Sequence, residues 1–249
     1  MSDFRNVVRG EVRKALTGRQ WWILPLAGTF LCLLSTFGFA SEGHKSIVAG
    51  GSAADVTNNI ARAWMMMFLF SSLFGAILVS REYGSGTVGR SVLLAGSRSR
   101  LLAAKTAVAT LAGGAFGLLA LALGALSCAV AGSAYGDAPA FTGETWLILL
   151  GCLACSVLAA PWGALLGWIV RNQVASVALI ITLTLVVDTG IQALAPEFAK
   201  YLLTIAMSSV YRDVKPDLLS VPLAFAVIAA WLAAAYYAAH RLVRTRDIV

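Results

Sequence analysis

The amino-acid sequence predicts an all-α, polytopic membrane protein with six transmembrane helices, and three observations support this class. Hydrophobic residues make up 59% of the 249 residues and charged residues only 12%, whereas about a quarter of an average soluble domain is charged. The apolar residues form six runs, and about 20 helical residues suffice to cross a bilayer core. The basic residues flank these runs, so the net charge of +7 indicates membrane orientation and not nucleic-acid binding.

Residues 3–19 predict an amphipathic helix that lies flat at the membrane interface. Its apolar side chains follow helical spacing and are Phe4, Val7, Val8, Val12, Ala15 and Leu16. Arg5, Arg9 and Arg13 recur every four residues on another face, where anionic lipid head groups would meet them. Because this segment is charged and the next apolar run is long enough to span, we expect no cleavable signal peptide.

The first two spans are expected at residues 21–40 and 60–80. Trp21 and Trp22 open the first span, and tryptophan prefers the level of the lipid head groups. Residues 41–59 between the two spans are polar and glycine-rich. We therefore expect a loop there, on the outer side of the membrane.

Three further spans follow along the chain. Residues 101–132 number about 32, more than the bilayer requires, so this helix should tilt or protrude on the inner side. Residues 145–170 contain Pro161, which should kink the helix because proline removes one backbone hydrogen bond. Residues 174–195 are rich in Val, Ile, Leu and Thr and form the fifth span.

Residues 196–218 are amphipathic and too polar to span. They predict one or two short helices folded into the outer face, before a sixth span at residues 219–239. Six spans place both termini on one side of the membrane. That side carries 14 Lys and Arg residues and the other side five, so the positive-inside rule places both termini in the cytoplasm, at the cell membrane.

Residues 81–100 lie in the longest hydrophilic break on the inner side. The break carries five basic residues, Arg81, Arg90, Arg98, Arg100 and Lys105. Its middle, residues 87–95, predicts a short amphipathic helix between glycines. A basic loop with a small helix, joined to a membrane helix at each end, could transmit a push from an outside partner into the bilayer.

The sequence lacks the motifs of common catalytic sites. It contains no P-loop, no H-E-x-x-H and no G-x-S-x-G pattern. His44 and His240 lie in different flanking segments, so we expect no metal site and no cofactor in this chain. Cys152 and Cys155 lie inside an apolar run, where a free cysteine acts as a small packing residue.

Asp188 is the one ionisable residue deep in a predicted span. An ionised Asp at mid-bilayer costs about 2.5–3.5 kcal/mol on the insertion scale. Asp188 could line a polar pathway together with Thr184 and Gln192, or a subunit seam. Alternatively, it lies close enough to Pro196 to be hydrated at the outer interface, and the sequence leaves both interpretations open.

With its six spans, basic leader and inner segment REYGSGT, the chain resembles an ATP-binding-cassette (ABC) type-2 membrane permease. The family has a short sequence motif directly after the second span, and it is matched here by Glu82, Tyr83, Gly86 and Thr87. Lys105 matches a basic residue that the family has at the start of the third span. The resemblance implies a coupling helix at residues 87–95 that docks on a separate ATPase. The implied coupling residues are Glu82, Tyr83, Gly86, Thr87, Val88, Arg90, Ser91, Val92, Leu93 and Leu94.

The same resemblance implies the partners and the activity. An ABC ATPase subunit would bind ATP and Mg, and a second permease copy would complete a pathway lined by the first, second and fifth spans. Transport would be outward, with a hydrophobic or amphipathic cargo such as a drug, peptide or lipid. Glu82 is placed to pair with an arginine of the partner, or with Arg9 or Arg13 of the leader.

Two other functions are weighed against export. A non-transporting immunity, sensing or scaffold subunit would use the same fold and the same ATPase contact. A membrane enzyme would need paired acids or a histidine within the spans, and of these only Asp188 is there. Transport assays in vesicles separate the first alternative from an exporter, and activity of the isolated chain would support the second.

Overall fold

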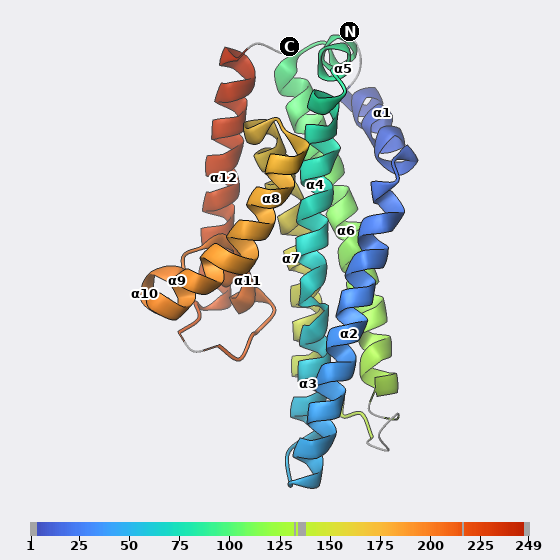
Figure 1. Cartoon of the computed structure of the whole chain (residues 1–249), viewed down its shortest axis with the longest axis vertical. Helices are drawn as coiled ribbons and strands as arrows, with labels where there is room; N and C mark the ends of the chain where they lie inside the picture. The colour runs from blue at the N-terminus through green and yellow to red at the C-terminus, as the bar shows by residue number, and fades with distance from the viewer. Residues whose placement is uncertain (1–3, 132, 134–137, 216, 247–249) are drawn as a thin grey trace.

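The computed structural model describes residues 4–131, 133, 138–215 and 217–246 (Figure 1). Across these residues it is 86% helical and has no strand, and six helical stretches are long and apolar enough to cross a membrane. The predicted all-α class with six spans is confirmed. The expected boundaries at residues 3 and 132, and Pro216 of the outer segment, lie outside the described residues.

The first three candidate spans and two further helices, α1 and α5, occupy the first half of the chain. They comprise α1 (Phe4–Thr17), α2 (Gln20–Val48), α3 (Ala53–Arg62), the 3-10 helix η1 (Ala63–Met66), α4 (Met67–Gly84), α5 (Val88–Ala95) and α6 (Arg98–Ala131). The second half comprises α7 (Gly143–Val170), α8 (Gln173–Thr182), the π-helix η3 (Leu183–Val187), α9 (Asp188–Leu194), α10 (Pro196–Ala199), α11 (Leu203–Val210) and α12 (Val221–Thr245).

The expectation that residues 41–59 form a loop is wrong, because helix occupies most of this stretch. The first helix runs on to Val48 and the next begins at Ala53, with Gly50 in the left-handed region at φ 90° between them. The two helices touch at Gly43, where an added Cβ would stand 2.3 Å from Val56. The absence of a side chain at Gly43 thus lets a polar stretch continue as a close helical hairpin.

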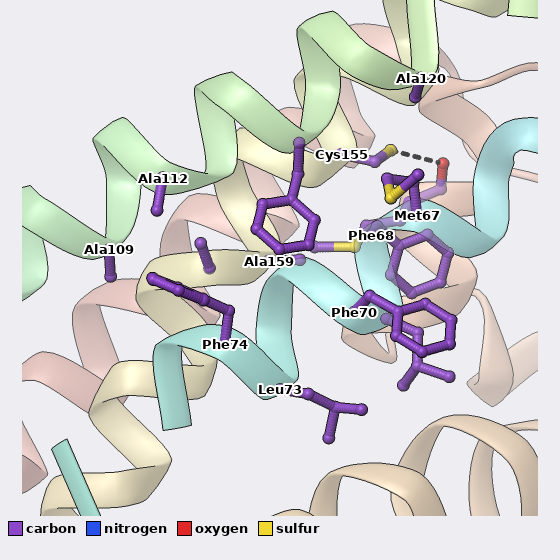
Figure 2. Close-up of a cluster of buried hydrophobic side chains, with 14 of the residues drawn as sticks. Met67, Phe68, Phe70, Leu73, Phe74, Ala109, Ala112, Ala120, Cys155 and Ala159 are labelled. Carbon is purple, nitrogen blue, oxygen red and sulfur yellow. Dashed lines mark hydrogen bonds between the residues drawn. The ribbon is translucent and has the colours of Figure 1, made fainter. Parts of the chain in front are cut away.

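Helices α4 and α7 form the centre of the bundle. Two glycines permit their close approach: a Cβ on Gly75 would stand 2.0 Å from the Ala160 carbonyl oxygen, and a Cβ on Gly163 would stand 1.8 Å from that of Ser72. Around this contact lies an apolar core in which Phe74 of α4 lies among alanines of α6 and α7 (Figure 2). Small residues therefore set the spacing of these helices, as is usual in membranes.

The segment before α12 folds back against the bundle. Helix α11 packs against α7 and α12, and the Cys155 thiol of α7 donates to the Met207 carbonyl oxygen at 3.4 Å. Figure 1 shows α9, α10 and α11 well short of the tip of the α2–α3 hairpin. The turn into this segment follows the π-helix η3, which widens the helix directly before Asp188.

The start of α1 and the end of α12 lie at the same end of the molecule as α5 (Figure 1). We call this the α5 end. Arg98 ties the helix ends together there, because its guanidinium donates to the Val243 and Arg246 carbonyl oxygens, both at 3.1 Å. Arg171 donates to the Leu242 carbonyl oxygen at 2.9 Å. These contacts hold the adjacent ends of α6, α7 and α12 together.

Candidate functional site

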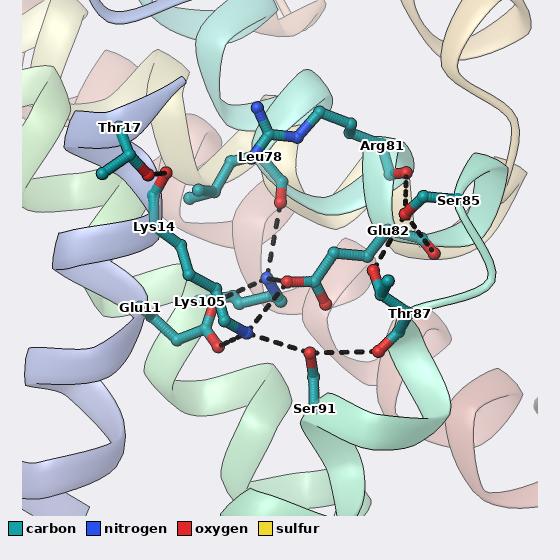
Figure 3. Close-up of polar contacts among 10 residues, drawn as sticks. All are labelled: Glu11, Lys14, Thr17, Leu78, Arg81, Glu82, Ser85, Thr87, Ser91 and Lys105. Atoms are coloured by element: carbon teal, nitrogen blue, oxygen red, sulfur yellow. Dashed lines mark hydrogen bonds and ion pairs between the residues drawn. The ribbon is translucent and has the colours of Figure 1, made fainter.

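Four charged side chains meet at the α5 end (Figure 3). Glu11 and Lys14 come from α1, Glu82 from the end of α4 and Lys105 from α6. Glu11 is 3%, Glu82 7% and Lys105 1% exposed. We call these four residues the charged cluster. Their charges cancel, which is the condition under which ionised groups tolerate burial.

Lys105 is the buried centre of the charged cluster. Its ammonium lies 2.6 Å from Glu11 Oε2 and 2.9 Å from Glu82 Oε1. The same Nζ donates to the Leu78 carbonyl oxygen at 3.4 Å. All three partners accept from one nitrogen, so α1, α4 and α6 converge on a single side chain.

Lys14 extends the charged cluster to α5. Its ammonium lies 2.6 Å from Glu11 Oε1 and 3.1 Å from Glu82 Oε1, and it donates to Ser91 Oγ at 2.9 Å. Burial alone would lower the pKa of Lys14, but the hydrogen bond and charge of Glu11, followed by those of Glu82, outweigh it. The pKa of Lys14 therefore lies above its ordinary 10.5.

Helical spacing explains how the charges reach the interior. Glu11 lies four residues after Val7 and four before Ala15, so it shares the inward face of α1. Lys105 likewise lies four residues after Leu101 on the buried face of α6. Each charged residue is thus buried because the apolar residues one turn away on the same helix face pack against the bundle.

Helix α5 has one face against the bundle and one face open. Val88, Ser91 and Ala95 are buried, and the Ser91 hydroxyl donates back to the Thr87 carbonyl oxygen at 3.3 Å. Leu93 is 82% and Leu94 67% exposed. An apolar pair that projects from a helix already packed on its other side is a typical protein contact surface.

A groove of about 210 Å³ runs between α1 and α5. Glu11, Lys14 and Ser91 line it together with Leu94, so the groove leads from the exposed face of α5 to the charged cluster. Left-handed glycines bound the helix, with φ 66° at Gly86 and 79° at Gly96. A side chain is strained in that conformation, which explains the glycines at both turns.

The remaining predicted coupling residues surround α5 and the end of α4. Gly86, Thr87 and Arg90 are exposed and Val92 is half-buried. The Tyr83 ring packs edge-on against Trp168, with ring centroids 5.9 Å apart, and the Arg171 guanidinium lies 5.3 Å from the Tyr83 ring centroid. Tyr83 therefore connects the end of α4 to α7.

Among the residues that the structure describes, Glu82 pairs with Lys14 and Lys105 and not with Arg9 or Arg13. The alternative pairing with an arginine of a partner stays a prediction. Arg5, Arg9 and Arg13 are exposed on the outer face of α1, as their common spacing predicts. The sequence interpretation missed Glu11 and Lys14 as site residues. The signal for Glu11 was its place within the apolar stripe of the helix.

The predicted pathway residues divide between two places. Asp188 and Thr184 line one cavity, and the Thr204 hydroxyl of the following segment donates to Asp188 Oδ2. Gln192 lies one turn beyond Asp188, half-buried, and lines none of the cavities described here. Asp188 is 6% exposed, so its side chain is buried within this chain.

The fold and the charged cluster define a class of protein. It is a multi-pass helical membrane protein with a short, partly exposed helix, α5, that is bonded to the charged cluster at one end of the bundle. The comparison with protein families agrees with this class. The chain belongs to the ABC-2 family transporter proteins, whose family model matches residues 7–188. Membrane proteins of this family generally work with ATPase subunits. No match was found among curated proteins.

Proposed function

We propose that this chain is the membrane permease subunit of an ABC exporter. A separate ATPase subunit hydrolyses ATP with Mg, and α5 is the coupling helix that receives the resulting movement. The cargo is hydrophobic or amphipathic and moves outward. Both termini and α5 face the cytoplasm of a cell membrane, and a second permease copy completes the pathway.

The observation that carries this proposal is the two-sided character of α5. Its exposed face presents Leu93 and Leu94, while its inner face reaches the charged cluster through Ser91 and Lys14. A partner that moves α5 must therefore move α1, α4 and α6 with it, because Lys14 and Lys105 bridge the same two carboxylates. A rigid connection between a docking surface and membrane helices is what a population shift between inward- and outward-open states requires.

The test is ATP hydrolysis by the complex of this chain with its ATPase, reconstituted in vesicles. Leu93→Asp with Leu94→Asp should abolish copurification of the ATPase and cargo-dependent stimulation of ATP hydrolysis. Val48→Asp is the matched control, because Val48 is 76% exposed at the opposite end of α2. The control should bind the ATPase normally.

Three results would decide between the functions. Loss of the ATPase only in the α5 variant supports coupling through α5. Normal stimulation in that variant contradicts it. Stimulated hydrolysis that moves no compound across the vesicle membrane would indicate a sensing or immunity subunit in place of an exporter.

A further inference from the structure

Two adjoining cavities flank the π-helix η3. One of about 170 Å³ lies between α7, η3 and α12. The other, of about 150 Å³, lies between α4, η3 and α11. Thr184 and Thr204 line both, so the two cavities meet at this pair of hydroxyl-bearing residues, beside Asp188.

Asp188 brings a buried carboxyl group to the first cavity. Thr204 donates to it through both its hydroxyl and its backbone N–H. Neither donor carries a charge. Within the part of the chain that the structure describes, no lysine or arginine forms an ion pair with Asp188. Lys215 lines the neighbouring cavity but pairs with Asp213 at 3.2 Å.

Two tryptophans line the same cavity as Asp188. Trp162 of α7 and Trp231 of α12 meet edge to face, with ring centroids 5.9 Å apart and planes at 82°. The Trp231 indole nitrogen donates to the Tyr201 carbonyl oxygen at 2.9 Å, which fixes the orientation of this ring. A cavity that combines indole rings with a carboxylate suits a cation, especially an ammonium group that carries methyl or methylene groups.

We propose that this cavity binds the ammonium head of an amphipathic organic cation. Asp188 supplies the countercharge, while Trp162 and Trp231 contact the alkyl groups of the ammonium. The inference rests on the proposed permease function and narrows its cargo to molecules with a cationic amine. The ligand in turn compensates a carboxylate whose burial in the span is otherwise unfavourable.

The size of the cavity limits what can enter it. Pockets for whole drug-sized ligands measure about 300–1,000 Å³, and this cavity of about 170 Å³ is smaller. It therefore takes a head group, and the apolar remainder of the cargo must lie outside it. Trp231 is 39% exposed, so the cavity reaches the surface of the chain on that side.

The experiment measures binding to the purified permease chain in nanodiscs, with no ATPase present. The probes are choline and its uncharged isostere 3,3-dimethylbutan-1-ol, titrated by calorimetry. Choline should bind about tenfold more tightly than the isostere. Asp188→Asn should remove this discrimination but retain the fold, because an amide oxygen still accepts from Thr204.

Two further variants keep the result interpretable. Glu197→Gln removes a nearby acid that is paired with Lys200 and should leave the preference for choline unchanged. Trp231→Leu should weaken choline binding while Asp188 is intact. Equal binding of both probes to the unmodified chain would overturn the proposal, as would an undiminished preference in a folded Asp188→Asn protein.

Because this assay uses no ATP, its outcome is separable from that of the proposed function. Choline selectivity without ATP-driven transport would leave the cation site standing and contradict export. Transport without choline selectivity would leave export standing and refute the cation site.

Discussion

The two ends of the bundle hold their charges in contrasting ways. At the α5 end, Lys105 and Glu11 lie 2.6 Å apart with side chains 1% and 4% exposed. Toward the opposite end, Arg212 and Glu144 also lie 2.6 Å apart, but their side chains are 40% and 38% exposed. The distances are equal, so burial and not geometry distinguishes the two pairs.

That difference determines what each pair contributes. Water screens the Arg212–Glu144 pair, and exposed pairs of this kind typically contribute about 0–1 kcal/mol. In the charged cluster Glu11, Glu82 and Lys105 are buried, so removal of one of them leaves a partner buried without its countercharge. We therefore expect the α5 end to respond sharply to single substitutions and the opposite end to tolerate them.

The largest effect is expected for Lys105→Met. This change leaves Glu11 and Glu82 with only Lys14 between them, so one buried negative charge is uncompensated. Removal of one partner of a buried pair costs about 3–5 kcal/mol. The midpoint of thermal unfolding of the purified chain should fall accordingly, and an unchanged midpoint would contradict the burial argument.

A double substitution serves as the matched control. Glu11→Gln together with Lys105→Met restores neutrality, because Lys14 and Glu82 then form a balanced pair at 3.1 Å. The double variant should be more stable than Lys105→Met alone. If it is less stable, then the cost arises from lost packing around the lysine stem and not from charge.

The next expected effect is a dependence on alkaline pH that arises at the α5 end. The folded-state pKa of Lys14 lies above 10.5, so its stabilising contribution is complete below that pH and is lost as pH rises through the folded pKa. As the pH rises above 10.5, the difference in unfolding midpoint between the unmodified chain and Lys14→Met should shrink. A difference that stays constant as the pH rises would show that Lys14 stabilises the fold through packing alone.

The sequence predicted most of the fold because hydrophobic length is a strong signal. Six apolar runs correspond to six candidate spans, and the short helix between the second and third spans lies within one residue of its expected start. The α2–α3 hairpin was missed because residues 41–48 are mostly polar, and polarity there indicated a loop. Packing of Gly43 against Val56 is a tertiary contact that no local pattern contains.

The candidate site was only partly predictable. Glu82 and Ser91 were expected at the coupling segment, and Glu82 was expected to pair with an arginine of a partner or of the leader, not with Lys14 and Lys105. Glu11 and Lys14 were not predicted as site residues, because the regular spacing of the arginines is the clearest charge pattern in their helix. Which charges face inward depends on how α1 packs on α6, a contact between residues more than 90 positions apart. The spacing of residues within one helix could indicate which face points inward, but not which charged side chain of another helix lies against that face.

A smaller effect is expected for Ser91→Ala. The hydroxyl accepts from Lys14 at 2.9 Å, and a hydrogen bond to a charged group contributes about 1.5–3 kcal/mol at most in buried settings. Because Lys14 keeps both glutamates and is partly hydrated, we expect a loss near 1 kcal/mol. Coupling should suffer more than stability, with clearly weaker stimulation of the ATPase and an unfolding midpoint that falls only slightly.

Ser85→Ala is the control for that variant. Ser85 lies between α4 and α5 and is exposed. Its hydroxyl bonds to the Arg81 and Glu82 carbonyl oxygens and to Thr87. It does not contact Lys14. Equal losses of stimulation in both variants would show that the Ser91–Lys14 contact is not the route of coupling.

The smallest effect is expected at the opposite end, for Glu144→Gln. Its partner Arg212 keeps access to water, and its backbone remains anchored because Arg62 Nε donates to the Arg212 carbonyl oxygen at 2.8 Å. The stability change should therefore stay within about 1 kcal/mol and shrink further at high salt. A loss of stability as large as that of Lys105→Met would contradict this expectation. It would mean that the Arg212–Glu144 pair is shielded from water in the assembled protein, for instance by a second copy of the chain.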